Sequence, residues 1–221
     1  EKCHDRRVDG AIFLSYIRGA EGEFLPLLAS DIPAVFVDMT LEGPVTSYVT
    51  SDNVKSAEMA VEYLFRLGHR EIGYVDGSTR SIPAEWRFQG FQKSIKNLGL
   101  HCSEQWIFQG AYDEQFGYQV VQKLQQLDHQ PTALVAQDNI AIGIIRALKE
   151  MGKTVPDDLS IVGFDDIEIS RHYDLTTIRQ QKYEMGVAAA ELLLRIINQR
   201  NNTPIVMDTE LVIRSSCKPI A

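Results

Sequence analysis

Short apolar runs alternate along this chain with amphipathic segments that have helical spacing. The runs are continuous rather than alternating in polarity, which is typical of strands covered on both faces. They occupy residues 8–14, 34–37, 72–75, 106–108, 133–136 and 160–164. Alternation of strands and helices predicts an α/β fold in which a parallel sheet is doubly wound, with right-handed crossovers and helices on both faces.

The segments between these runs carry apolar residues at spacings of three and four, and several of them stop at a glycine, as helices do. The apolar faces of the expected helices span residues 57–67, 88–98, 116–127, 141–151 and 185–196. Two further apolar runs follow at 205–207 and 211–213. They could complete one sheet or two, so the residue pattern alone leaves the number of domains open.

Composition excludes several classes of protein. None of the apolar runs in these 221 residues approaches the roughly 18 residues that a membrane-spanning helix needs, so no membrane partner is expected. Thirty acidic residues against 22 basic ones, a net charge of −8, argue against duplex DNA binding by these residues. The three cysteines are far apart in sequence and are interpreted as reduced thiols of a cytoplasmic protein.

The candidate binding residues follow the predicted strands, because ligands of open α/β sheets lie beyond the carboxyl ends of the strands. Almost every strand is followed by a hydrogen-bonding side chain. These are Ser15, Asp38, Asp76 with Ser78, Gln109 with Tyr112, Gln137 with Asp138, and Asp165 with Asp166, while Trp86 and Arg87 open the helix after the third strand. Carboxylates and amides exchange hydrogen bonds with hydroxyls, and aromatic rings cover the apolar face of a sugar, so the set favours an uncharged, hydroxyl-rich ligand.

Other roles are open to some of these residues. Asp52 and Asp138 are interpreted first as helix caps. His69, at a predicted helix end, is interpreted as a structural residue whose cationic ring favours the helix dipole. The adjacent acids Asp165 and Asp166 suggest acid–base chemistry, but neighbours on an extended strand point in opposite directions.

Catalysis has little support in the sequence. The chain has no GxSxG, GxGxxG, GxxxxGK[ST] or HExxH motif, and its five histidines are scattered without metal-ligand spacing. We therefore predict that the protein is not an enzyme and has no catalytic residues, no metal site and no cofactor.

Several motifs resemble, in order along nearly the whole chain, those of the lactose-repressor (LacI/GalR) family of bacterial transcription regulators. The most specific is Val-Pro-Asp-Asp-Leu-Ser-Ile-Val-Gly-Phe-Asp-Asp at 155–166. The others are Val-Asp-Gly-Ala-Ile-Phe-Leu at 8–14, Ile-Pro-Ala-Val-Phe-Val-Asp at 32–38, Ser-Asp-Asn at 51–53, Leu-Gly-His-Arg-Glu-Ile at 67–72, Arg-x-x-Gly-Phe at 87–91, Asp-x-x-Ala-x-Gly at 138–143, Leu-Thr-Thr-Ile at 175–178 and Ile-Arg-Ser-Ser at 213–216.

The resemblance implies an effector-binding domain with a periplasmic-binding-protein-like type I fold, made of two doubly wound parallel-sheet lobes joined by three crossovers. The first lobe would comprise residues 1–69 and 181–202 and would be incomplete, and the second would comprise 70–180 and 203–221. The crossovers would lie near 69–71, 177–181 and 203–210. The family's DNA-binding helix-turn-helix is absent from these residues.

The resemblance also implies effector-binding residues. Matching positions are Asp38, Arg87, Tyr112, Gln137, Asp165 and Gln180, and Gln180 is the only one that the strand ends do not indicate. Ser15, Asp76, Ser78 and Trp86 are secondary candidates from the strand ends. We expect Arg87 and Asp165 to hydrogen-bond neighbouring hydroxyls of one ligand, and neither to be needed by the core.

The function implied is effector sensing by a cytoplasmic transcriptional repressor or activator. A small molecule, expected to be a sugar, would bind in a cleft between the lobes and alter operator binding by a homodimer, with DNA contacted only through the absent domain. A periplasmic sugar-binding protein of a transport system is the alternative, and an α/β enzyme that uses Asp165 is a third. A helix-turn-helix or a signal peptide encoded upstream would distinguish the first two, and turnover would reveal the third.

Overall fold

The computed structural model describes residues 8–14, 32–38, 47–77, 81–198 and 203–220. Its chain divides into two compact units. Unit 1 comprises residues 1–52, 80–85 and 181–208, and unit 2 comprises 53–79, 86–180 and 209–221. Both contain strands and helices, and all their strand pairings but one are parallel, which confirms the predicted α/β class.

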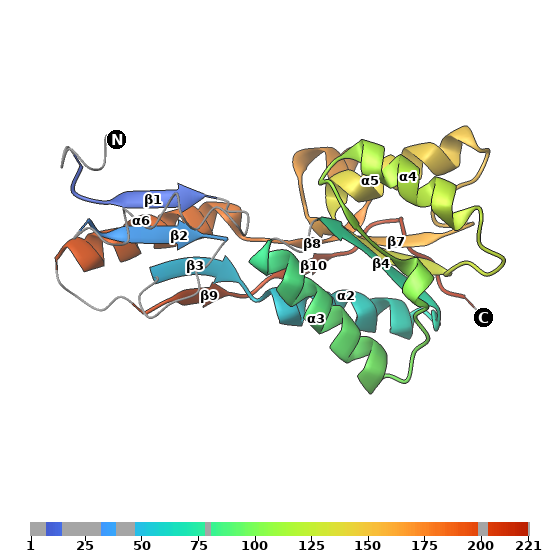
Figure 1. Cartoon of the computed structure of the whole chain (residues 1–221), viewed down its shortest axis with the longest axis horizontal. Helices are drawn as coiled ribbons and strands as arrows, with labels where there is room; N and C mark the ends of the chain where they lie inside the picture. The colour runs from blue at the N-terminus through green and yellow to red at the C-terminus, as the bar shows by residue number, and fades with distance from the viewer. Residues whose placement is uncertain (1–7, 15–31, 39–46, 78–80, 199–202, 221) are drawn as a thin grey trace. The chain divides into compact units, whose positions relative to one another are not determined.

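Unit 1 is built on a four-stranded parallel sheet. Its strands, in the order β1-β2-β3-β9, are β1 (Ala11–Leu14), β2 (Ala34–Val37), β3 (Ser47–Ser51) and β9 (Ile205–Met207). Helix α6 (Lys182–Ile197) packs along this sheet (Figure 1). Its buried side chains Met185, Ala189 and Leu192 share a small core with valines of β2 and β3.

Unit 2 has a six-stranded sheet in the order β10-β8-β7-β6-β4-β5. Its strands are β4 (Ile72–Gly77), β5 (Ile107–Gly110), β6 (Ala133–Ala136), β7 (Ser160–Asp165), β8 (Thr176–Arg179) and β10 (Glu210–Val212). Only β10, at the edge, is antiparallel to its neighbour. The helices are α2 (Asn53–Arg66), α3 (Ile82–Asn97), α4 (Glu114–Leu124) and α5 (Asp138–Glu150), with 3-10 turns η1 (Glu104–Trp106) and η2 (Glu168–Tyr173). The first residues of α3, through Glu85, are grouped with unit 1.

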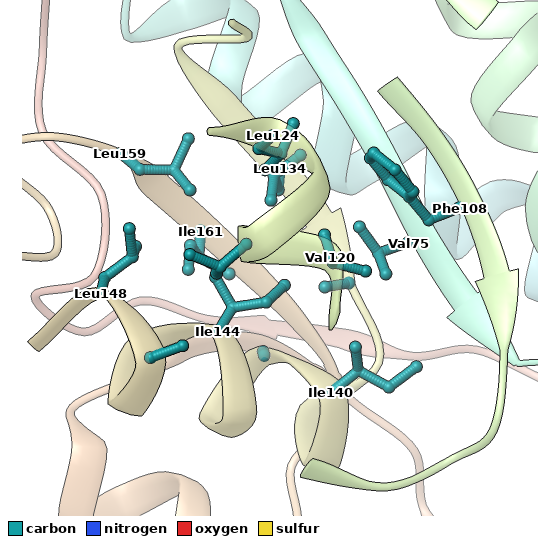
Figure 2. Packing of buried hydrophobic residues seen from close by; sticks show 14 of the residues in the cluster. Val75, Phe108, Val120, Leu124, Leu134, Ile140, Ile144, Leu148, Leu159 and Ile161 are labelled. Carbon is teal, nitrogen blue, oxygen red and sulfur yellow. The ribbon is translucent and has the colours of Figure 1, made fainter. Parts of the chain in front are cut away.

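Two apolar cores cover the two faces of this sheet, because successive strand residues point to opposite sides. On one face Val75, Leu134 and Ile161 meet α4 and α5, and Figure 2 shows Ile140 and Ile144 of α5 pointing into this cluster. On the other face the neighbouring residues Tyr74, Val135 and Val162 pack with α2 and α3. Figure 1 shows the two helix pairs on opposite sides of the unit 2 sheet.

The two units differ from the predicted lobes at three places, which are residues 53–69, 80–85 and 203–208. Helix α2 packs on β6, β8 and β10 and belongs to unit 2, so the chain passes between units at 52/53 rather than near 69–71. Strand β9 pairs with β3 and belongs to unit 1, although residues 203–221 were assigned to the second lobe. Helix α2 buries its apolar face against the unit 2 sheet. Strand β9 pairs with the edge of β3 that is not occupied by β2.

The C-terminal segment closes unit 2 by hydrogen bonds to early parts of the chain. Ser216 donates its hydroxyl to the Ile161 carbonyl and accepts from the Thr176 amide, and Ile220 N–H donates to the Leu67 carbonyl. Buried His69 lies 2.9 Å from the Thr132 hydroxyl and 3.2 Å from the Lys218 carbonyl. Burial lowers the pKa of His69, which disfavours the cationic ring that the sequence suggested at this helix end.

Helices α4 and α5 touch through their backbones. A Cβ atom added at Gly143 would lie 2.1 Å from the Glu114 carbonyl oxygen, and one at Gly117 would lie 2.4 Å from that of Ile140. Neither backbone atom can rotate out of the way. Glycine is therefore needed where the two helices meet.

We predict that Gly143→Ala destabilises the protein by about 1–3 kcal/mol, because the added methyl forces the helices apart. The matched control is Gly186→Ala in α6, where an added Cβ meets no atom within 4 Å. That substitution should instead stabilise by up to about 1 kcal/mol, the intrinsic preference of a helix for alanine. Urea denaturation measures both, and equal effects would contradict the proposed helix contact.

Among the described residues, no helix is both long and apolar enough to span a membrane.

Candidate functional site

The candidate site in unit 2 lies at the carboxyl ends of its parallel strands. Strands β5, β4, β6, β7 and β8 run in the same direction, so the residues that follow them share one edge of the sheet. Five of the six predicted effector residues, all except Asp38, lie in this unit. Their side chains form two hydrogen-bonded groups.

The first group consists of Gln137, Asp165 and Gln180, which follow or end three neighbouring strands. Gln137 Nε2 donates to Asp165 Oδ2 at 2.8 Å, and Gln180 Nε2 donates to Asp165 Oδ1. Both glutamines are buried and Asp165 is half-buried. One carboxylate thus lies between two amides, each with a carbonyl oxygen of its own, so the group can both donate and accept.

Gln137 is held in place by α5. Its Oε1 accepts hydrogen bonds from the amides of Asn139 and Ile140 at the first turn, which makes Gln137 the N-cap of the helix. With that oxygen anchored, the Nε2 group is directed to Asp165. The helix terminus therefore fixes one of the two donors of the carboxylate.

Asp165 and Asp166 both have positive φ angles, 117° and 46°. Their carboxylates have separate partners: Asp166 accepts from Arg179 Nε at 2.7 Å and from Arg214 Nη2 at 2.6 Å. Burial alone would raise the pKa of Asp166, but the hydrogen bonds and charges of the two arginines outweigh it and lower this pKa. The two acids therefore do not form a pair for acid–base chemistry.

The second group surrounds Arg87 of α3. Arg87 Nε donates to Asp76 Oδ2 at 2.7 Å and Nη2 donates to Asp76 Oδ1 at 3.2 Å. Its Nη1 donates to Asn53 Oδ1 at 3.2 Å, and Nη2 also donates to the Tyr112 hydroxyl at 3.3 Å. The guanidinium lies 4.7 Å from the centre of the Phe164 ring. Arg87 was expected to lie outside the core, whereas its side chain is buried inside a polar network.

Asp76 and Arg87 form a buried ion pair at the centre of this group. Asp76 also accepts from the Tyr74 hydroxyl at 2.7 Å and from the Gly77 amide at 2.7 Å, which satisfies both its oxygens. Burial tends to lower the pKa of Arg87, but the charge and hydrogen bonds of Asp76 outweigh it and hold the pKa well above its usual value. Arg87 is therefore held in its cationic form in the folded protein.

The two predicted aromatic residues are partly accessible. Tyr112 is 41% exposed, and its ring lies against the backbone of Gly77, where an added Cβ would meet it at 1.9 Å. Trp86, a secondary candidate, is half-buried on α3. The exposed part of Tyr112 could contact a ligand bound at this edge of the sheet.

Asp138 has a role that the sequence did not indicate. It was interpreted as the cap of its helix, but the cap is Gln137, and fully buried Asp138 instead holds the segment after β7. Its Oδ2 accepts from Ser170 Oγ at 2.7 Å and from the Ile167 amide at 3.0 Å, and its Oδ1 accepts from Thr177 Oγ1 at 2.7 Å. The Thr-Thr pair after the 3-10 turn indicates only that its hydroxyls need hydrogen-bond partners, and not that Asp138, 39 residues away, is one of them.

The remaining predicted residues lie elsewhere. Asp38 is in unit 1, just beyond the carboxyl end of β2, with a φ of 53°, and accepts from Thr50 Oγ1 at 3.5 Å. Ser15 and Ser78 fall outside the described residues. Within the described part of the chain, no three histidine, cysteine, aspartate or glutamate side chains are grouped so that they could hold a metal ion.

Comparison with known proteins places this geometry in context. A family model described as a periplasmic binding protein-like domain matches residues 61–217. The HTH-type transcriptional repressor PurR of Mannheimia succiniciproducens is 32% identical over 226 residues, which cover 100% of this chain and 68% of that protein. The repressor of the same name from Pasteurella multocida is 34% identical, over 96% of this chain and 65% of its own length. The chain thus spans about two thirds of these relatives.

Two solved structures have a similar fold. A LacI transcriptional regulator from a Rhodococcus species superposes with a TM-score of 0.89 and is 30% identical, with 99% of this chain and 81% of that chain covered. A complex of the transcriptional regulator CelR with cellobiose gives a TM-score of 0.88 at 26% identity, with 97% of this chain and 68% of that chain covered.

Proposed function

Because the chain belongs to the LacI/GalR family of transcriptional regulators, we propose that it senses a small, uncharged, hydroxyl-rich effector at the carboxyl edge of the unit 2 sheet. The observation that carries the proposal is the group formed by Gln137, Asp165 and Gln180. Three adjacent strands bring a carboxylate and two amides to the edge at which open α/β sheets bind their ligands.

The chemistry of this group suits a polyol or a sugar. A half-buried carboxylate accepts hydrogen bonds from vicinal hydroxyls, and an amide both donates and accepts. The exposed part of the Tyr112 ring covers the apolar face of a sugar ring, as aromatic side chains do in ligand pockets. A sugar effector also agrees with the cellobiose bound to the related regulator CelR. We assign effector contacts to Asp38, Tyr112, Gln137, Asp165 and Gln180, and secondary roles to Arg87, Trp86 and Asp76, because Asp76, Asn53 and Tyr112 already engage the Arg87 guanidinium.

The whole protein would act as a regulator through this binding. Effector binding changes the relative population of conformations, and that change alters operator affinity. The regulator would act in the cytoplasm as a homodimer. Each subunit would contact operator DNA through a helix-turn-helix domain outside these residues. Catalysis forms no part of the proposal, because the relatives are described as repressors. For the same reason we place a transport role second.

A thermal-shift screen of the full-length protein tests this function. The screen compares neutral mono- and disaccharides, sugar phosphates and purines, since a ligand at 100 times its Kd adds about 2.7 kcal/mol of stability. A neutral sugar should raise the melting temperature. If no sugar stabilises the protein and another class does, the sugar assignment is wrong.

Asp165→Asn should weaken binding of the effector found in that screen by about tenfold or more, because the variant loses a charged acceptor of ligand hydroxyls. Asparagine tolerates a positive φ, so the turn at this position should survive. Isothermal titration calorimetry measures the affinity. Asp128→Asn, which removes one charge at an exposed position, is the control and should bind as the unmodified protein does. Equal affinities in the two variants would exclude Asp165 from the site.

A further inference from the structure

Resting on the function proposed above, we propose that Asp76 is a specificity-determining residue that makes this edge reject anionic ligands, phosphorylated sugars in particular. Asp76 is the penultimate residue of β4, and Arg87 lies in the second turn of α3. Their side chains are 3% and 6% exposed. Asp76 forms hydrogen bonds with the same N–H groups of Arg87 that would otherwise bind a phosphate group.

The geometry of the pair is the one that an arginine offers to a phosphate. Asp76 accepts from Nε and Nη2 through its two oxygens, at 2.7 and 3.2 Å, which is the bidentate fork that guanidinium groups use for carboxylates and phosphates. Hydrogen bonds to Asn53 and Tyr112 engage two more N–H groups. Four of the five N–H groups of an arginine are therefore in use.

Two other arginines in the described part of this edge are occupied as well. Arg179 at the end of β8 and Arg214 both pair with Asp166, and Arg179 also pairs with Glu210. Unlike Asp76 and Asp166, Asp165 has no arginine among its described partners, which are the side-chain amides of Gln137 and Gln180. Among the described residues, a phosphate at this edge would thus meet a negative charge and no available arginine fork, whereas a hydroxyl would find an acceptor.

Inorganic phosphate tests this inference without knowledge of the effector. In Asp76→Asn the side chain keeps its size and one acceptor oxygen, but Arg87 loses its counter-charge. Calorimetry at constant ionic strength, with chloride as reference, should show that Asp76→Asn binds phosphate about tenfold more tightly than the unmodified protein or more. Asp128→Asn makes the same change in net charge at an exposed position and should leave phosphate binding unchanged. Equal phosphate affinity in all three proteins would overturn the proposal.

A second measurement uses the unmodified protein and does not depend on the folding of the variant. Glucose is compared with glucose 6-phosphate, and ribose with ribose 5-phosphate, by thermal shift. Neither phosphorylated compound should stabilise the protein more than its parent sugar does. A larger shift from a phosphorylated member would overturn the role of Asp76 while leaving effector sensing intact. Phosphate binding gained by Asp76→Asn, with no stabilisation by any neutral sugar, would support the role of Asp76 and contradict the sugar effector instead.

Discussion

Arg87→Ala should lower the free energy of unfolding by about 3–5 kcal/mol, the typical cost of removing one partner of a buried ion pair. Among the described residues, the variant leaves the buried Asp76 carboxylate with the Tyr74 hydroxyl and the Gly77 amide as donors. It also removes the contact of the guanidinium with the Phe164 ring and the hydrogen bond to Asn53. Urea denaturation provides the measurement.

Arg66→Ala is the control for this prediction. Arg66 pairs with Glu62 one turn away on α2, and their side chains are 78% and 52% exposed. Loss of such an exposed pair should cost no more than about 0.5 kcal/mol. Replacing both members of the buried pair, as in Asp76→Leu with Arg87→Met, should cost less than Arg87→Ala alone, because no buried charge is left without a partner. If Arg87→Ala and Arg66→Ala cost the same, Arg87 is not part of the core.

The free energy of unfolding should depend on pH through the titration of Asp138. Burial raises the pKa of this carboxyl from an ordinary value of 3.8 to about 7, against the hydrogen bonds of Ser170 and Thr177, and the nearby charge of Asp165 raises it further. Between about pH 4 and pH 7 the folded state therefore holds a proton that the unfolded chain has released. Stability contributed by this group falls as the pH rises through that range, by roughly 4 kcal/mol in total at 1.36 kcal/mol per unit.

Asp138→Asn should remove this slope. The amide keeps one oxygen for Ile167 and Ser170, and the Thr177 hydroxyl can rotate to accept from the new NH2 group. Relative to the unmodified protein, the variant should gain stability as the pH rises from about 4 to 8. The lowered pKa of His69 acts in both proteins and cancels in the difference. Parallel stability curves for the two proteins would show that Asp138 stays ionised throughout, and Asp128→Asn provides the reference for a change of charge at an exposed site.

Much of the fold could be predicted from the sequence because most of its strands are continuous apolar runs. Strands β3 and β8 escaped prediction for the opposite reason. They read Ser-Tyr-Val-Thr-Ser and Thr-Thr-Ile-Arg, yet Thr50, Thr176 and Thr177 are buried. The hydroxyls of Thr176 and Thr177 form hydrogen bonds with Arg214 N–H and Asp138, partners more than 35 residues away. Such pairings become visible only when the sheet is assembled.

The candidate site was predictable in position but not in its internal contacts. The rule that ligands lie beyond strand ends, applied to the apolar runs, indicated Gln137 and Asp165, which the structure brings within 2.8 Å. Nothing in the spacing of Asp76 and Arg87 showed that they form an ion pair, because that contact depends on how α3 packs on the sheet. For the same reason the arginine was expected to be available to a ligand.

The hydrogen bonds of the C-terminal segment have a consequence for protein synthesis. A ribosome releases the chain from its N-terminus onward, so His69 emerges 149 residues before the Lys218 carbonyl that it contacts in the folded protein. Strands β4 to β8 are exposed to solvent before β10 can cover the free edge of β8. An exposed strand edge is a template for pairing with other chains. Nascent chains that stall before residue 210 should therefore be the form of this protein that depends most on chaperones.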